Sequence, residues 1–170
     1  MKAHQRSVEL TELFYRKGFM GECDKKTSFD ILDFFYKSGG NFVDTANNYQ
    51  VCLLLTKEKF PAADSIQKEE SEIWLGEWMK ERNNRDQMVV ATKFTTAYRA
   101  GYGDKEIIIN STGNGTKSLH LSLEASLKKL QTTYIDLLYV HWWDFTCSVR
   151  ERLHHSRVLL GGVRANSSRL

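Results

Sequence analysis

The stretch Ser118–His141, SLHLSLEASLKKLQTTYIDLLYVH, decides the fold of this 170-residue chain. Its first half places leucines along one stripe at helical spacing. Its last part, Tyr134–His141, mixes β-branched, aromatic and leucine side chains, as strands do. A helix followed by a strand is therefore predicted. The leucines of the stripe are Leu119, Leu123, Leu127 and Leu130.

The same alternation of helix and strand occurs twice upstream. Residues 27–38 carry apolar side chains at helical spacing, begin with a Thr or Ser that can cap a helix, and end at a pair of glycines. A short strand is predicted at 41–46 and a second helix at 71–83, where Trp74 and Trp78 are four residues apart. The run MVVATK at 88–93 is typical of a strand buried on both faces.

Alternating helices and strands predict an α/β fold with a parallel sheet, either doubly wound or a (β/α)8 barrel. No G-x-G-x-x-G motif follows a predicted strand, and GNGTKS at 113–118 fails the P-loop pattern because Thr116 separates the glycine from the lysine. The barrel is therefore favoured. A whole barrel needs roughly 250 residues, so we expect only its N-terminal half, an incomplete barrel. No strand is predicted before Lys17.

Composition excludes several classes of protein. The formal charge is +3, from 24 basic and 21 acidic residues, which favours neither a nucleic-acid binder nor a polybasic membrane anchor. No apolar run approaches the ~20 residues that span a bilayer. The three cysteines form no Cys-x-x-Cys pair, so neither a disulfide framework nor a zinc site is indicated. We expect a cytoplasmic protein without nucleic-acid or membrane partners.

Each predicted strand ends in a polar residue that can carry chemistry. Asp44, Lys93 and His141 occupy these ends, and Tyr49 follows Asp44. In (β/α)8 enzymes the functional groups lie at the C-terminal ends of several strands, so these side chains can converge. A phenol ionises near pH ~10, but a neighbouring ammonium favours the phenolate, and a carboxylate keeps that ammonium charged. An imidazole can orient a carbonyl oxygen.

Such a set can transfer a proton, but no side chain supplies a hydride, so reduction chemistry implies a nicotinamide. Each residue also has an ordinary structural reading. Asp44 can cap a turn, Lys93 can belong to a structural ion pair, and His141 can be a hydrogen-bonded core histidine. Tyr49 can be a loop tyrosine.

Several segments resemble fungal aryl-alcohol dehydrogenases and norsolorinic acid reductases of the aldo-keto reductase family. They are GGNFVDTANNYQ (39–50), SEIWLGEWM (71–79), RDQMVVATKFT (85–95) and SLEASLKKLQTTYIDLLYVHWWD (122–144). The resemblance implies a (β/α)8 fold, NADPH as cofactor, and small aromatic carbonyl compounds or alcohols as substrates. It also implies that Tyr49 donates the proton, with Lys93 and Asp44 as its charged partners, and that His141 orients the substrate. Asp44 is also expected at the cofactor.

The chain departs from the family pattern in two places. The resemblance covers a partial domain, 17–148, but VCLLLTKEKFPAADSIQ at 51–67 interrupts it beside Tyr49, which is consistent with a translated intron. The basic segment 149–170 lacks the likeness and is expected to be a disordered tail.

Three functions therefore remain open. They are an NADP-dependent oxidoreductase of aromatic aldehydes, ketones and alcohols, a truncated inactive remnant, and a non-catalytic binding or regulatory subunit. An open half-barrel exposes sheet edges, so self-association is expected.

Overall fold

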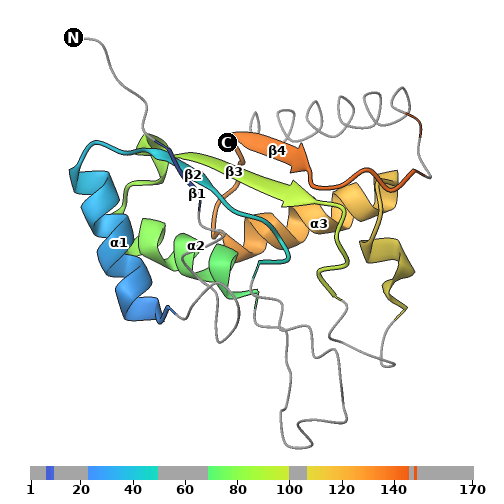
Figure 1. Cartoon of the computed structure of the whole chain (residues 1–170), viewed down its shortest axis with the longest axis horizontal. Coiled ribbons are helices and arrows are strands. Elements are labelled where there is room, and N and C mark those ends of the chain that lie inside the picture. Colours follow the sequence, from blue (N-terminus) through green and yellow to red (C-terminus); the bar gives the residue numbers. More distant parts are fainter. Residues whose placement is uncertain (1–6, 10–22, 50–68, 100–106, 146–147, 149–170) are drawn as a thin grey trace, which may run out of the picture.

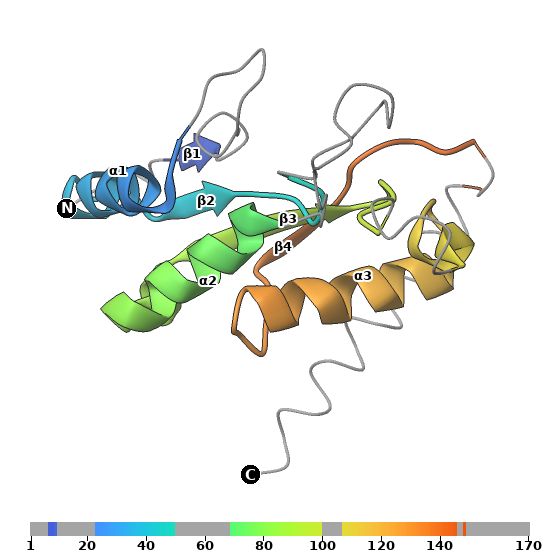
Figure 2. The same cartoon turned by 90° about the horizontal axis from the view of Figure 1, so that it is seen from below.

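The computed structural model describes residues 7–9, 23–49, 69–99, 107–145 and 148. Within these residues one parallel sheet has the order β1-β2-β3-β4, and three α-helices lie together on one of its faces (Figure 1). Figure 2 shows the same arrangement from the helical side. The strands are β1 (Ser7–Glu9), β2 (Phe42–Asp44), β3 (Val89–Phe94) and β4 (Leu137–Val140). The helices are α1 (Lys25–Lys37), α2 (Glu70–Arg82) and α3 (Thr116–Lys129).

The layering confirms the predicted fold class. In a doubly wound sheet the helices cover both faces, whereas in a (β/α)8 barrel they all lie outside the strands. The described helices cover one face, so the sheet is part of a barrel wall (Figure 1). Short 3₁₀ turns, Arg85–Gln87 and Ile108–Ser111, precede β3 and α3.

The prediction that no strand lies before Lys17 was wrong. Ser7–Glu9 forms β1 and pairs with β2 in parallel, with Val8 opposite Val43. A strand of three residues with one apolar side chain has no measurable periodicity. Only its pairing with β2 defines it.

Helix α1 begins earlier than its apolar pattern indicated. The prediction that Thr27 or Ser28 caps the helix was wrong. The cap is Asp24, whose carboxylate accepts a hydrogen bond from the Thr27 amide at 2.7 Å. Lys25 and Lys26 are good helix formers and extend the first turn. The predicted stop is confirmed, because Gly39 takes a φ of +82°, which glycine adopts without strain.

The core lies between the helices and the sheet. Its buried side chains are Leu32, Val43, Leu75, Trp78, Met79, Met88, Val90 and Leu130. Helices α2 and α3 approach closely at Gly76, where an added Cβ would lie 2.4 Å from the Lys129 carbonyl oxygen. A glycine is therefore required at this contact.

Strand β4 is shorter and more exposed than its sequence indicated. The predicted strand started at Tyr134, but pairing with β3 starts at Leu137. The residue before it, Asp136, instead uses its carboxylate to accept the Val90 amide at 2.8 Å and to pair with Arg85. Leu137 and Tyr139 are 40% and 41% exposed. These exposed apolar side chains lie on an edge strand of the described sheet.

The predictions for the insertion at 51–67 and the tail at 149–170 lie outside the described residues. The boundaries of the partial domain, 17–148, also stay a prediction. Among the helices that the structure describes, none is long and apolar enough to cross a membrane.

Candidate active site

Lys93 is the centre of a buried polar cluster at the C-terminal end of β3. Its ammonium lies 2.8 Å from Asp44 Oδ1, and it donates hydrogen bonds to the Tyr49 phenol oxygen at 3.0 Å and to the Thr45 carbonyl oxygen at 3.1 Å. The side chains of Lys93 and Asp44 are only 13% and 19% exposed. These three contacts match the three N–H donors of an ammonium.

The loop after β2 brings Tyr49 to Lys93 by following β3. Its amides continue the pattern of the sheet, because the Thr45 N–H donates to the Ala91 carbonyl at 2.9 Å and the Asn47 N–H donates to the Lys93 carbonyl at 3.2 Å. Tyr49 is 8% exposed. The register of the sheet therefore fixes which residue of β3 the phenol meets.

His141 reaches the same cluster from the end of β4. Its backbone N–H donates to the Phe94 carbonyl at 2.8 Å, so β3 also positions this residue. The imidazole lies edge-on to the Tyr49 ring, with centroids 5.7 Å apart and planes at 82°, and it stacks on Trp142 at 5.3 Å. The predicted site residues Asp44, Tyr49, Lys93 and His141 thus come together at one end of the sheet.

The electrostatics keep Lys93 charged. Burial by itself lowers the pKa of an ammonium, but the hydrogen bonds and charges of Asp44 and Tyr49 outweigh burial and raise the pKa of Lys93 above its ordinary value. Because the Tyr49 oxygen accepts from this ammonium, its own hydrogen can be donated to another group. The cluster can therefore supply a proton to a bound oxygen atom.

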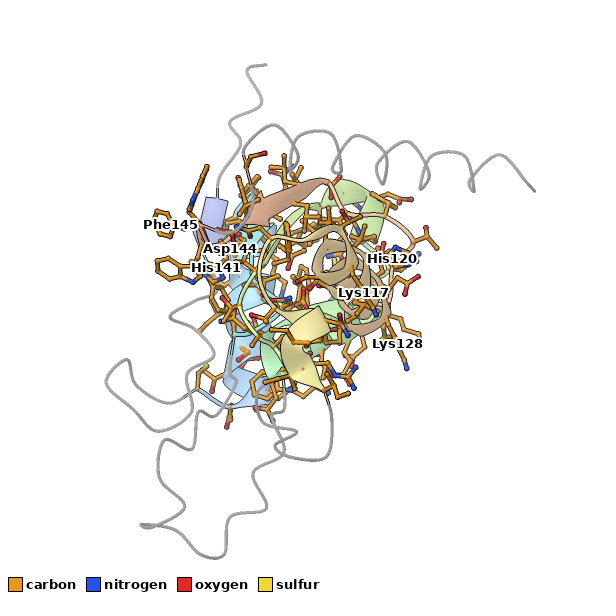
Figure 3. The ribbon with its side chains drawn as sticks, turned by 90° about the vertical axis from the view of Figure 1, so that its right-hand side faces the viewer. Lys117, His120, Lys128, His141, Asp144 and Phe145 are labelled. Atoms are coloured by element: carbon orange, nitrogen blue, oxygen red, sulfur yellow. The ribbon has the colours of Figure 1, made fainter. Side chains whose placement is uncertain are left out.

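Two loops beside the site are tied together by Asn114 and Asp144. The Asp144 carboxylate accepts the Asn114 amide at 2.5 Å, and the Asn114 side chain donates to the Trp142 carbonyl at 3.0 Å. Thr95 donates to the same side chain at 2.6 Å. Figure 3 shows His141, Asp144 and Phe145 on one side of the molecule. Sequence reasoning did not single out this pair, because no spacing links residues thirty apart in the chain.

A second buried ion cluster was also missed. Lys129 contacts both Glu69 and Glu72, and the side chain of Glu72 is only 1% exposed. Burial raises the pKa of the Glu69 carboxyl, against the opposing effect of Lys129. Burial acts to lower the pKa of Lys129, but the charges of Glu72 and Glu69 raise it overall. A lysine at a helix end gives no sign in sequence that it is buried.

Among the described residues, no three His, Cys, Asp or Glu side chains gather closely enough to hold a metal ion. The donor set at Lys93 consists instead of a phenol, an ammonium, a carboxylate and an imidazole. Such groups handle protons and bind oxygen atoms, but they cannot deliver a hydride. They therefore fit the reacting end of a nicotinamide cofactor.

Comparison with known proteins gives a consistent result. A family model described as the aldo/keto reductase family matches residues 14–157. Norsolorinic acid reductase B of Aspergillus parasiticus is 52% identical over 134 residues, and the aryl-alcohol dehydrogenase (NADP+) of Phanerodontia chrysosporium is 46% identical over 148 residues. These matches cover 79% and 85% of the chain. They cover 30% and 34% of the two relatives, so the chain spans about a third of their length.

A solved structure supports the fold. A protein of Pseudomonas aeruginosa that is assigned to the aldo-keto reductases superposes with a TM-score of 0.59 at 19% identity, and the match covers 94% of this chain and 51% of that one. At this identity the likeness concerns the fold alone. It agrees with a sheet that forms part of a barrel.

Proposed function

The chain belongs to the aldo/keto reductase family, and from this premise we propose that it is an NADP-dependent oxidoreductase that interconverts aromatic aldehydes or ketones with alcohols. One observation carries the proposal. Lys93 contacts Asp44 and Tyr49 at the same time, and the His141 ring lies edge-on to the Tyr49 ring. The relatives support the class of reaction, and the geometry supports the choice of residues.

Tyr49 is the proposed proton donor. During reduction the carbonyl carbon gains a hydride, the C=O π electrons move to the oxygen, and that oxygen takes the phenol proton of Tyr49. Lys93 stabilises the phenolate that remains, because its ammonium is already hydrogen-bonded to this oxygen at 3.0 Å. General acid catalysis of this kind contributes typically ~10²–10⁴-fold. Alcohol oxidation follows the same steps in reverse.

Asp44 and His141 are proposed to orient the reacting groups. Asp44 holds the Lys93 ammonium at 2.8 Å and so keeps it directed at Tyr49. His141 is beside the Tyr49 ring, where an imidazole N–H can donate to the substrate oxygen and stabilise the charge that develops there. We also propose Asp44 as a cofactor contact, as the family resemblance implies.

The proposed cofactor is NADP(H), which supplies the hydride when bound. The polar cluster fits the nicotinamide end, because its proton donor and its oxygen-binding groups lie together and lack only a source of hydride. The choice of NADP over NAD is supported by the name of the relative from Phanerodontia chrysosporium.

The proposed substrates are aromatic. Trp142 and Trp143 follow His141 directly and are 64% and 43% exposed, and Phe145 contacts Trp143 with ring centroids 6.2 Å apart. Exposed aromatic rings beside an oxygen-binding group offer flat apolar surface for an aryl substrate. The named relatives, a norsolorinic acid reductase and an aryl-alcohol dehydrogenase, support the same class.

Strand β4 supports a further proposal, self-association. It is one of the two edge strands of the described sheet, and its residues Leu137 and Tyr139 are exposed. Unpaired strand edges with apolar side chains associate with other edges. Sedimentation velocity of the 170-residue chain should show dimers or larger species, and a purely monomeric chain at micromolar concentration would contradict this.

The decisive experiment follows NADPH absorbance in the presence of an aromatic aldehyde. Tyr49→Phe is the test variant, and Tyr134→Phe is its matched control. Tyr134 precedes β4, so it lies at the other end of this strand from His141, and its hydroxyl contacts Asp86. We expect oxidation of NADPH that Tyr49→Phe abolishes and Tyr134→Phe leaves intact. A folded chain that never oxidises NADPH, or turnover that survives Tyr49→Phe, would overturn the proposal.

A further inference from the structure

Lys129, the last residue of α3, reaches the loop that carries Tyr49. Its ammonium donates to the Asn47 carbonyl oxygen at 3.2 Å and lies 2.6 Å from Glu72 Oε2, and it also contacts Glu69. Only 11% of its side chain is exposed. The ammonium therefore joins the end of α3, the start of α2 and the loop after β2.

Asn47 is held on both sides of its backbone. Its N–H donates to the Lys93 carbonyl at 3.2 Å, and its carbonyl accepts from Lys129. Asn47 lies between Asp44 and Tyr49, the two residues that the Lys93 ammonium contacts. The position of its peptide therefore sets the direction in which the chain arrives at Tyr49.

Glu72 connects the same cluster to β3. Its second oxygen accepts a hydrogen bond from Thr92 at 2.6 Å, and Thr92 directly precedes Lys93. The neighbouring Ser71 shares a hydrogen bond with Thr45 at 2.7 Å, and the Thr45 carbonyl accepts from Lys93. The start of α2 thus contacts the side chain of Thr92, which precedes the predicted catalytic lysine, and the side chain of Thr45, whose carbonyl oxygen that lysine contacts.

A buried ion cluster of this kind adds little net stability to a fold. Desolvation of buried ions offsets much of their attraction, and apolar side chains of similar volume are often as stabilising or more so. In some proteins the role of a buried ionic network is instead to fix one geometry of the groups that it contacts. Here the fixed element is the peptide that leads to Tyr49.

We propose that Lys129, anchored by Glu72, is a positioning residue that fixes the Asn47 carbonyl and so places the Tyr49 phenol on the Lys93 ammonium. The inference rests on the proposed role of Tyr49 as proton donor. Neither Lys129 nor Glu72 touches the reacting atoms in this proposal, and both act through the loop after β2.

The test variant combines Lys129→Met with Glu72→Gln. One positive and one negative charge are removed together, so the net charge of the cluster is unchanged. Glu69 loses its contact with Lys129, but the double variant is more tolerable to the fold than Lys129→Met alone, which would leave two buried carboxylates without it. The matched control is Lys128→Met, which removes the neighbouring lysine. Lys128 is exposed and points away from the body of the protein (Figure 3).

The experiment measures the environment of the Tyr49 ring and the exchange of the amides in its loop. The chain has seven tyrosines, and labelling them with ¹³C at Cζ gives each an NMR signal. The signal of Tyr49 is identified as the one that disappears from the spectrum of the Tyr49→Phe variant. In the double variant we expect this signal to move toward that of free tyrosine. We also expect the Asn47 and Tyr49 amides to exchange with solvent roughly tenfold faster or more, while the Val90 amide keeps its rate. Lys128→Met should change none of these.

Two results would overturn the inference. One is a folded double variant whose Tyr49 signal and loop exchange match the unmodified chain. The other is equal acceleration at Asn47 and Val90, which would mean that the cluster only stabilises the fold. If the chain turns over NADPH, the double variant should also lower kcat while KM for the aldehyde stays the same. If it shows no turnover, the proposed function fails, and the NMR and exchange data still decide the positioning role.

Discussion

The Lys93 ammonium lies 3.0 Å from the Tyr49 phenol oxygen, although 44 residues separate them in the chain. The contact exists because β2 and β3 pair in parallel with Asp44 opposite Ala91, so that the loop after β2 runs beside the end of β3. Asp44 completes the arrangement from the last position of β2. The chemistry proposed for this protein depends on that register.

Lys93→Met should abolish most of the proposed activity. The variant removes the charge that stabilises the Tyr49 phenolate and leaves Asp44 without its ion pair. We expect a fall in kcat/KM of ~10²-fold or more, as for loss of acid-base assistance. NADPH oxidation measures the effect, and Lys26→Met, which removes an exposed lysine paired with Asp30, is the control. Equal activity in both variants would remove Lys93 from the mechanism.

Trp142→Ala should weaken the use of aromatic substrates more than that of aliphatic ones. Trp142 stacks on His141 with an angle of 11° between the rings and is 64% exposed. If it forms the surface for aryl groups, KM for an aromatic aldehyde rises by roughly tenfold, whereas KM for a short aliphatic aldehyde changes little. Parallel steady-state measurements with both aldehydes check this. A uniform rise for both substrates would point instead to loss of His141 positioning.

Asp33→Asn should weaken the packing of α1 on α2 in a pH-dependent way. The Asp33 carboxylate accepts hydrogen bonds from Arg82 at 3.0 Å and from the Trp78 indole at 2.8 Å. The Arg82 hydrogen bond lowers the pKa of Asp33, against a smaller opposing effect of burial. A lowered pKa in the folded state means that the stabilisation is present above the unfolded value of ~3.9 and is lost as the pH falls through the folded value.

Chemical denaturation of Asp33→Asn and of the unmodified chain measures how the stabilisation by Asp33 depends on pH. The difference in unfolding free energy should be constant between pH 6 and 8, in a window well above ~3.9, and should shrink toward pH 3. Asp30→Asn is the control, because Asp30 forms only an exposed pair with Lys26. A difference that grows on acidification would contradict the assignment.

Gly76→Ala should destabilise the fold even though alanine is the better helix former. The added Cβ would lie 2.4 Å from the Lys129 carbonyl oxygen and 2.7 Å from backbone atoms of Leu130, and backbone cannot move aside as a side chain can. Overpacking typically costs about 1–3 kcal/mol, which exceeds the ~1 kcal/mol gained in helix propensity. Thermal unfolding measures the change. A raised Tm would show that α2 and α3 can separate without loss.

Local sequence patterns were sufficient for the main elements of the fold. The leucine stripe of α3 and the β-branched run of β3 predicted their helix and strand, because these elements bury one face or both. Short or capped segments were not predictable in the same way. β1 is defined by pairing with β2, and the start of α1 is set by an Asp24 side chain that the apolar pattern does not include.

The candidate site also contains residues that the sequence identified and residues that only the structure revealed. Chemical type and position at or after strand ends made Asp44, Tyr49, Lys93 and His141 candidates, since the C-terminal ends of parallel strands meet at one edge of the sheet, and the family resemblance implied their roles. The sequence by itself thus determined the fold class and the four candidate residues, whose roles stay a prediction. Only the tertiary structure decided that Lys129 and Glu72 lie behind the Tyr49 loop, because a buried ion cluster depends on packing between elements far apart in the chain, and no local pattern carries that information.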